Sequence, residues 1–103
     1  MSPDFSAMAD VDRLIHEPAR LMIVTVLNSV EEADFLYLLN ATGLTKGNLS
    51  AHLSKLAEAN YVEIEKTYHG KIPQTLLRIT PTGQKAFESY RVHLRKIMRT
   101  IES

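Results

Sequence analysis

The spacing of apolar residues changes twice along the chain, and these changes restrict the folds that it can adopt. Up to Ala59, and again from Pro81, apolar residues recur every three or four positions, as they do on helices. Between these two parts, residues 61–79 are rich in Tyr, Val, Ile and Thr, which favour strands. The predicted order is therefore several helices, one hairpin and a last helix. The predicted fold class is mainly α with a small β-hairpin.

The length of 103 residues and the absence of cysteine exclude several classes of protein. One hydrophobic core serves a chain of this length, so we expect a single domain over residues 1–103, with a loosely ordered N-terminus at residues 1–10. Neither a disulfide framework nor a thiolate metal site can form without cysteine. No apolar run approaches the ~20 residues of a membrane helix, and Met1–Asp12 lacks the features of a signal peptide. We expect a cytoplasmic protein with no membrane partner.

Two helices are predicted before residue 30. The first is short and runs through Val11, Leu14 and Ile15. Pro18 then favours the first turn of a longer helix, where its missing N–H needs no partner. This longer helix ends near Asn28 and is apolar on most sides, so we expect it to be central and buried. Its Val, Ile and Thr residues would also suit a strand, but its length and its proline favour a helix.

Two further helices follow, joined by a four-residue turn that contains Gly43. Asp34 is a suitable N-cap for the first, over residues 35–40, and Thr45 for the second, over residues 46–59. The glycine can adopt the positive φ of a tight helix end. Two helices joined by a short turn with glycine match the helix-turn-helix motif.

The hairpin and the last helix are marked by turn and cap residues. The two strands are predicted to flank a loop over residues 69–74, which contains a glycine and a proline. Thr80 and Pro81 then predict the N-cap and the first position of a last helix, over about residues 81–102.

Apolar residues on this last helix form a seam with steps of three and four residues, typical of helices that pack on one another. The domain is small and the seam extends far past the hairpin, so we expect it to contact a second copy of the chain. The alternative is that this face packs only on the core of its own domain. The predicted dimer contacts are Phe87, Tyr90, Leu94, Ile97, Met98 and Ile101.

Three segments resemble prokaryotic winged helix-turn-helix regulators of the arsenic-repressor-like (ArsR) and multiple-antibiotic-resistance-repressor-like (MarR) groups. Residues 44–56 resemble their recognition-helix segment, and residues 79–87 resemble the Leu-Thr-x-x-Gly element that joins wing and last helix. Residues 16–21 resemble the start of their first core helix. Asn60 stands where these families often have glycine, and asparagine also adopts the left-handed conformation. The resemblance implies a winged helix-turn-helix with a three-helix core, a two- to three-stranded wing and a C-terminal dimerisation helix.

The same resemblance implies a transcriptional regulator that binds double-stranded DNA as a homodimer, at a palindromic operator. The recognition helix, about residues 45–59, would enter the major groove, and the wing, about residues 69–74, would lie on the backbone or the minor groove. Asn48 can pair with adenine and Ala51 can contact a thymine methyl group. The predicted DNA-binding residues are Thr45, Lys46, Gly47, Asn48, Ser50, Ala51, Ser54, Lys55, His69, Lys71 and Gln74.

The distribution of charge agrees with a nucleic-acid partner, although the formal net charge is zero. Residues 1–44 contain two basic and seven acidic residues, whereas residues 45–103 contain ten basic and five acidic residues. The chain is therefore acidic before the predicted recognition helix and basic from there onward. Such an asymmetry can mark a binding face, although two solvated surfaces of opposite sign would also produce it.

The sequence predicts neither an enzyme nor a metal or cofactor site. The four histidines, His16, His52, His69 and His93, lie on separate elements and have no ligand spacing. No Ser-His-Asp arrangement or glycine-rich phosphate loop is present. No segment remains for an effector domain, so an effector would bind in the core or between two copies. A second hypothesis is a winged helix that assembles with another protein and does not bind DNA specifically.

Overall fold

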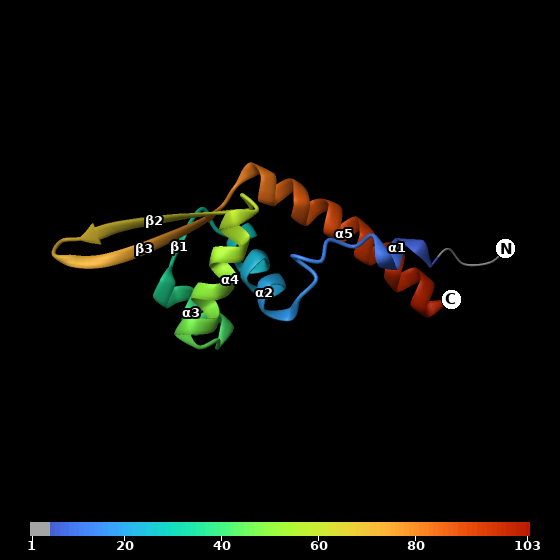
Figure 1. Cartoon of the computed structure of the whole chain (residues 1–103), viewed down its shortest axis with the longest axis horizontal. Helices are drawn as coiled ribbons and strands as arrows, with labels where there is room; N and C mark the ends of the chain where they lie inside the picture. Colours follow the sequence, from blue (N-terminus) through green and yellow to red (C-terminus); the bar gives the residue numbers. More distant parts are fainter. Residues whose placement is uncertain (1–4) are drawn as a thin grey trace.

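The computed structural model describes residues 5–103, which form five helices and a three-stranded antiparallel sheet (Figure 1). In chain order the elements are α1 (Ser6–Ala9), α2 (Pro18–Asn28), β1 (Ala33–Asp34), α3 (Phe35–Thr42), α4 (Lys46–Glu58), β2 (Val62–His69), β3 (Ile72–Ile79) and α5 (Pro81–Glu102). The sheet order is β1-β3-β2. This architecture confirms the predicted fold class, a mainly helical winged helix with a hairpin wing.

The molecule is elongated, with extents of 63 × 25 × 21 Å. The β2–β3 hairpin projects from one end, and α5 with α1 beside it projects from the other (Figure 1). Helices α2, α3 and α4 lie between them and enclose the core with the base of the sheet. None of the helices in residues 5–103 is both long and apolar enough to cross a membrane.

Side-chain caps start the helices at the predicted positions. Asp34 Oδ1 accepts a hydrogen bond from the backbone N–H of Tyr37 at 2.7 Å, and Thr45 Oγ1 accepts one from Asn48 at 3.2 Å. Each bond satisfies a backbone donor that has no partner within the first turn of a helix. Gly43 ends α3 with a φ of +70°, as the turn requires. These contacts define the helix-turn-helix unit of α3 and α4.

The first short helix was predicted through Val11, Leu14 and Ile15, and this prediction was wrong. The Asp12 carboxylate accepts hydrogen bonds from the backbone N–H groups of Leu14 and Ile15, at 2.9 and 3.2 Å, and so stabilises a turn there. The short helix lies earlier, at α1, within the segment expected to be loosely ordered. Met1–Asp4, which belong to the same expectation, lie outside the described residues.

The predicted six-residue loop at the wing tip was also wrong, because the turn contains only Gly70 and Lys71. Gly70 has a φ of +66°, and a tight two-residue hairpin turn needs a positive φ of this kind. Pro73 is a strand residue paired with Tyr68. Strand β1 pairs only with Leu76 and Leu77, so no strand lies beside Pro73 on the side away from β2. A proline is tolerated at such an open edge because no neighbouring strand needs its N–H.

The predicted dimer seam on α5 is divided by the structure. Phe87, Tyr90 and Ile97 are core residues, with at most 9% of their surface exposed, so they cannot supply the contact area predicted for a partner. The chain's own N-terminal segment covers this face, since α1 lies against α5 (Figure 1). The hydroxyl of Tyr90 also lies 2.9 Å from Nδ1 of His16. Of the other predicted contacts, Leu94 is half-buried, whereas Met98 and Ile101 are 45% and 62% exposed.

The start of β2 is held against the N-terminal segment and α5. The phenol of Tyr61 donates a hydrogen bond to Oδ2 of Asp12 at 2.7 Å. Asn60 precedes it with a φ of +62°, the left-handed conformation in which the resembled families often have glycine. The backbone N–H of Thr80 donates to the Tyr61 carbonyl at 3.0 Å, which brings the first turn of α5 onto this strand.

Burial, together with the hydrogen bond to Asp12, raises the pKa of Tyr61 to about 12. Because its pKa in the folded chain exceeds the ordinary value of 10.0, its contribution to stability is complete below pH 10 and is lost as the pH rises toward 12. We expect the ultraviolet difference titration between wild type and Tyr61→Phe to have its midpoint near pH 12. We also expect the substitution to lower the free energy of unfolding at pH 7 by about 1 kcal/mol. With folding monitored by circular dichroism at each pH, a midpoint near pH 10 would contradict the bond.

Candidate nucleic-acid interface

The exposed side of α4 brings together the residues predicted to meet DNA. Leu49, Leu53 and Leu56 are at most 2% exposed and fix the opposite side of the helix to the core. The eight predicted residues on this helix and at its cap are all exposed, namely Thr45, Lys46, Gly47, Asn48, Ser50, Ala51, Ser54 and Lys55. They are small, polar or basic, so a flat partner can approach the helix closely.

A network of polar side chains holds α4 against the start of α2. Arg20 Nη1 lies 3.1 Å from Nδ1 of His52 on α4, and Arg20 Nε donates to the carbonyl of Leu14. Glu17 caps α2 by accepting from the backbone N–H groups of Ala19 and Arg20, and its carboxylate lies 3.8 Å from His52. His52 is thus a partly buried histidine with two polar partners, Arg20 and Glu17.

The same network changes the pKa of Glu17. Burial acts to raise this pKa, but hydrogen bonds from the backbone N–H groups of Arg20 and Ala19, with the charges of His52 and Arg20, lower it below the ordinary value of 4.5. Glu17 therefore remains ionised at neutral pH and keeps its cap and its contact with α4. The orientation of α4 is set by this network and by the buried apolar stripe of Leu49, Leu53 and Leu56.

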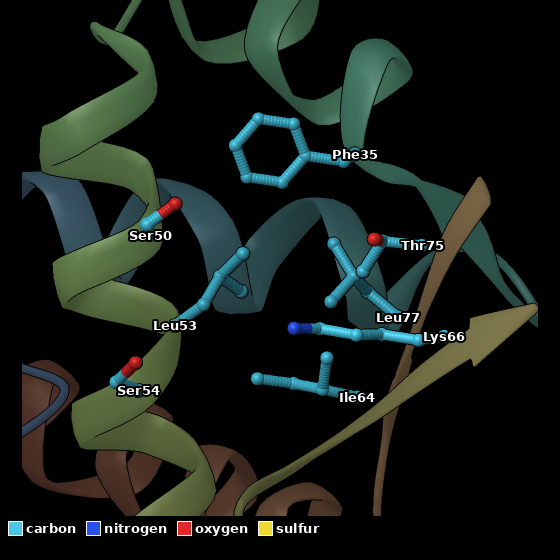
Figure 2. Close-up of a pocket in the computed structure, with 8 residues that line it drawn as sticks. All are labelled: Phe35, Ser50, Leu53, Ser54, Ile64, Lys66, Thr75 and Leu77. Carbon is cyan, nitrogen blue, oxygen red and sulfur yellow. The ribbon is translucent and has the colours of Figure 1, made fainter. Parts of the chain in front are cut away.

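The wing has two faces of different character, because successive side chains of a strand point to opposite sides. Ile64 and Lys66 of β2 pair with Leu77 and Thr75 of β3, and all four line a groove that faces α4. The groove has a volume of about 410 Å³, and its other lining residues are Phe35, Ser50, Leu53 and Ser54. Figure 2 shows the Lys66 side chain extending from β2 toward α4. We call this side of the hairpin the inner face.

The other side of the hairpin, which we call the outer face, carries a cluster of ion pairs. Arg78 lies 2.9 Å from Glu65, 3.7 Å from Glu32 and 3.8 Å from Glu63. The hydrogen bond with Glu65 is the main cause that raises the pKa of Arg78. Arg78 is therefore engaged by three carboxylates, and this face as a whole is acidic.

The structure separates the three predicted wing residues. Lys71 is exposed at the tip. His69 and Gln74 belong to the outer face, since they alternate with Lys66 and Thr75 along their strands. The Gln74 side chain donates to Oδ2 of Asp34 at 3.4 Å.

Ser50 and Ser54 belong both to the predicted DNA-binding residues and to the lining of the groove. Lys66 and Thr75, which also line the groove, were not among the predicted residues. Strand alternation would have found them, had the predicted hairpin turn been two residues long.

The lysines around α4 and the wing have no ionic partner. Among residues 5–103 the ion pairs involve Arg20, His52, Arg78 and Arg91 with glutamates, and none includes Lys46, Lys55, Lys66 or Lys71. No ion pair within residues 5–103 compensates their positive charges, which favours binding of an anionic polymer.

Comparison with known proteins identifies this arrangement. Residues 19–98 match the family model described as a winged helix DNA-binding domain. The chain belongs to this family. Membership confirms the predicted recognition of a winged-helix regulator. The family description also confirms the coarser part of the predicted function, a domain that binds DNA.

This winged-helix protein is similar in sequence to one protein and similar in fold to several solved structures. It is 32% identical over 90 residues to an uncharacterised protein of Methanocaldococcus jannaschii, an alignment that covers 87% of this chain and 98% of the relative. A transcriptional regulator homologue from Pyrococcus horikoshii OT3 has the same fold, with a TM-score of 0.88, 22% identity and coverage of 96% and 100%. A MarR-family transcriptional regulator from Enterococcus faecalis V583 has a TM-score of 0.72, 18% identity and coverage of 99% and 94%.

Proposed function

We propose that this winged-helix protein recognises a specific double-stranded DNA site as a homodimer, with α4 in the major groove and the wing along the backbone. The observation that carries the proposal is the exposed side of α4, which has two unpaired lysines and no carboxylate before Glu58. Helix α4 has 13 residues and is therefore about 20 Å long. An α-helix with its side chains is about 10–12 Å in diameter, so it fits a major groove that is about 12 Å wide.

The residues of this side have distinct proposed roles. Asn48 is suited to pair with the edge of an adenine, and Ala51 to contact a thymine methyl group, so these two would read sequence. Lys46, Lys55 and Ser54 would bind phosphates, together with the free N–H groups at the start of α4. Lys71 at the wing tip would add a further phosphate contact. Phosphate contacts position the protein and make its affinity depend on salt.

The exposed part of α5 supports the proposed homodimer. Met98 and Ile101 are exposed apolar side chains there, and half-buried Leu94 lies beside Met98 in a groove of about 400 Å³. A second copy of α5 would remove this surface from water. The dimer would pair identical patches around a two-fold axis, which predicts a palindromic operator with half-sites about 34 Å apart.

The proposal is tested by selecting bound duplexes from a random pool and measuring affinity by fluorescence anisotropy across salt concentrations. The double variant Lys46→Ala and Lys71→Ala should weaken binding to all sequences. It removes four lysines from each dimer, so the slope of log K against log salt should fall by about 4. Asn48→Ala should instead relax the preference at one base position, by about 1–3 kcal/mol of discrimination. Sedimentation of the complex should give two chains per palindromic duplex.

The control is Lys96→Ala, which removes a positive charge from α5, the helix that extends away from the wing (Figure 1). Its affinity and salt slope should equal those of the wild type. If the selection yields no preferred sequence, and the double variant binds as the wild type does, the proposal is wrong. Assembly with another protein would then be the better hypothesis.

A further inference from the structure

The groove between α4 and the wing has the chemistry of a site for one nucleic-acid backbone. Its polar groups are the ammonium of Lys66 and the hydroxyls of Ser50, Ser54 and Thr75, all of which can donate hydrogen bonds to phosphate oxygens. The other four lining residues are apolar, namely Phe35, Leu53, Ile64 and Leu77. Donors beside an apolar surface suit an anionic phosphate linked to an apolar sugar face.

The two faces of the wing differ in charge, and this difference selects the side that can meet DNA. The inner face includes no carboxylate and consists of Val62, Ile64, Lys66, Tyr68, Pro73, Thr75, Leu77 and Ile79. The outer face carries Glu63 and Glu65, with Glu32 beside them, against Arg78 alone. A phosphate backbone is therefore attracted to the inner face and repelled by the outer face.

We infer that the wing meets DNA with its inner face only, and that Lys66 binds a backbone phosphate of the strand that passes between α4 and the hairpin. This inference rests on the proposed function. Tyr68 continues the inner face toward the tip, is 71% exposed, and packs its ring against the neighbouring sugar. His69 and Gln74, on the outer face, do not contact the DNA.

Lys66 and Lys71 serve different phosphates. Three strand residues and Gly70 separate Lys66 from Lys71, so the two Cα atoms are about 10 Å or more apart. Successive phosphates of one strand advance by only about 3.4 Å along the helix axis. The effects of removing the two lysines should therefore multiply, as they do for independent contacts.

The experiment compares substitutions on the two faces, with the duplex selected above. Lys66→Met should weaken binding about tenfold per half-site for every duplex, with the salt slope lowered by about 2 because each dimer loses two lysines. Lys66→Arg should retain the affinity, and Tyr68→Ala should weaken it. His69→Ala and Gln74→Ala on the outer face, and Lys96→Met on distal α5, are the matched controls and should bind as the wild type does. Of the five substituted residues, Gln74 is half-buried and the other four are exposed. Thermal unfolding verifies that each of the six variants is folded.

The phosphate itself is located by replacing single phosphates of the duplex with uncharged methylphosphonates. At one position the wild type should lose about tenfold in affinity, whereas Lys66→Met should lose nothing further. If Lys66→Met binds normally while Lys46→Ala weakens binding, the inference fails and the proposed function stands. Weakening by His69→Ala or Gln74→Ala equal to that by Lys66→Met also overturns it. If the wild type binds no duplex, both the proposed function and this inference fail.

Discussion

Gly83→Ala is expected to lower the free energy of unfolding by about 2–4 kcal/mol. A methyl group at this position would collide with the carbonyl oxygen of Tyr61 and lie 2.9 Å from Cγ1 of Ile79. The carbonyl cannot simply move away, because it accepts a hydrogen bond from the backbone N–H of Thr80 at 3.0 Å. Relief of the collision would therefore move the first turn of α5 away from the base of the wing.

Urea denaturation followed by circular dichroism measures this effect. A small domain has only about 5–15 kcal/mol of stability, so the loss should shift the transition visibly. Gly47→Ala is the matched control, since a Cβ at Gly47 would have no atom within 4 Å and the residue lies within α4. That variant should gain about 0.5–1 kcal/mol, because alanine favours the helix. Equal stability of Gly83→Ala and the wild type would show that α5 does not pack on Tyr61 in solution.

Contacts that span three or four residues were largely predictable from the sequence. The caps by Asp34, Thr45 and Thr80 belong to this class, as does the turn at Gly43, because the interacting groups are close in the chain. Asp12 shows the limit of such reasoning. Its carboxylate accepts from the N–H groups two and three residues later, as an N-cap does, but the chain continues as a turn and not as a helix.

The wing residues were predicted less well because their roles depend on the strand register. Glycine and proline near the tip indicated a long loop, which left the register of the strands undefined. The two-residue turn fixes Lys66 opposite Thr75 and places both on the inner face. A shift of one residue would have exchanged the two faces, so the loop length decided which side chains reach the groove.

Burial of the α5 seam shows why a periodic pattern does not identify the partner of a helix. Phe87, Tyr90 and Ile97 recur at helical spacing whether they face a second chain or their own core. The covering segment includes His16, which is 74 residues distant in sequence and lies 2.9 Å from the hydroxyl of Tyr90. Only the tertiary arrangement brings it to α5, and no local pattern reports that contact.

Leu49→Ala is expected to destabilise the fold by about 2–5 kcal/mol, because it removes a fully buried side chain and leaves a cavity. Leu49 is the first residue of the stripe that holds α4 to the core, and Asn48 and Ser50 flank it on the exposed side. Ser50→Ala is the neighbouring control and should change stability by less than about 0.5 kcal/mol, because its side chain is exposed.

Each of the two variants should lower one quantity only, the stability for Leu49→Ala and the DNA affinity for Ser50→Ala. At a temperature at which Leu49→Ala is still folded, its DNA affinity should equal that of the wild type, because Leu49 faces the core. Ser50→Ala should retain its stability but bind DNA more weakly, because a hydroxyl is lost from the groove. Urea denaturation and fluorescence anisotropy on the same samples measure both quantities. Loss of affinity by fully folded Leu49→Ala would show that the apolar stripe also adjusts the position of α4 in the major groove.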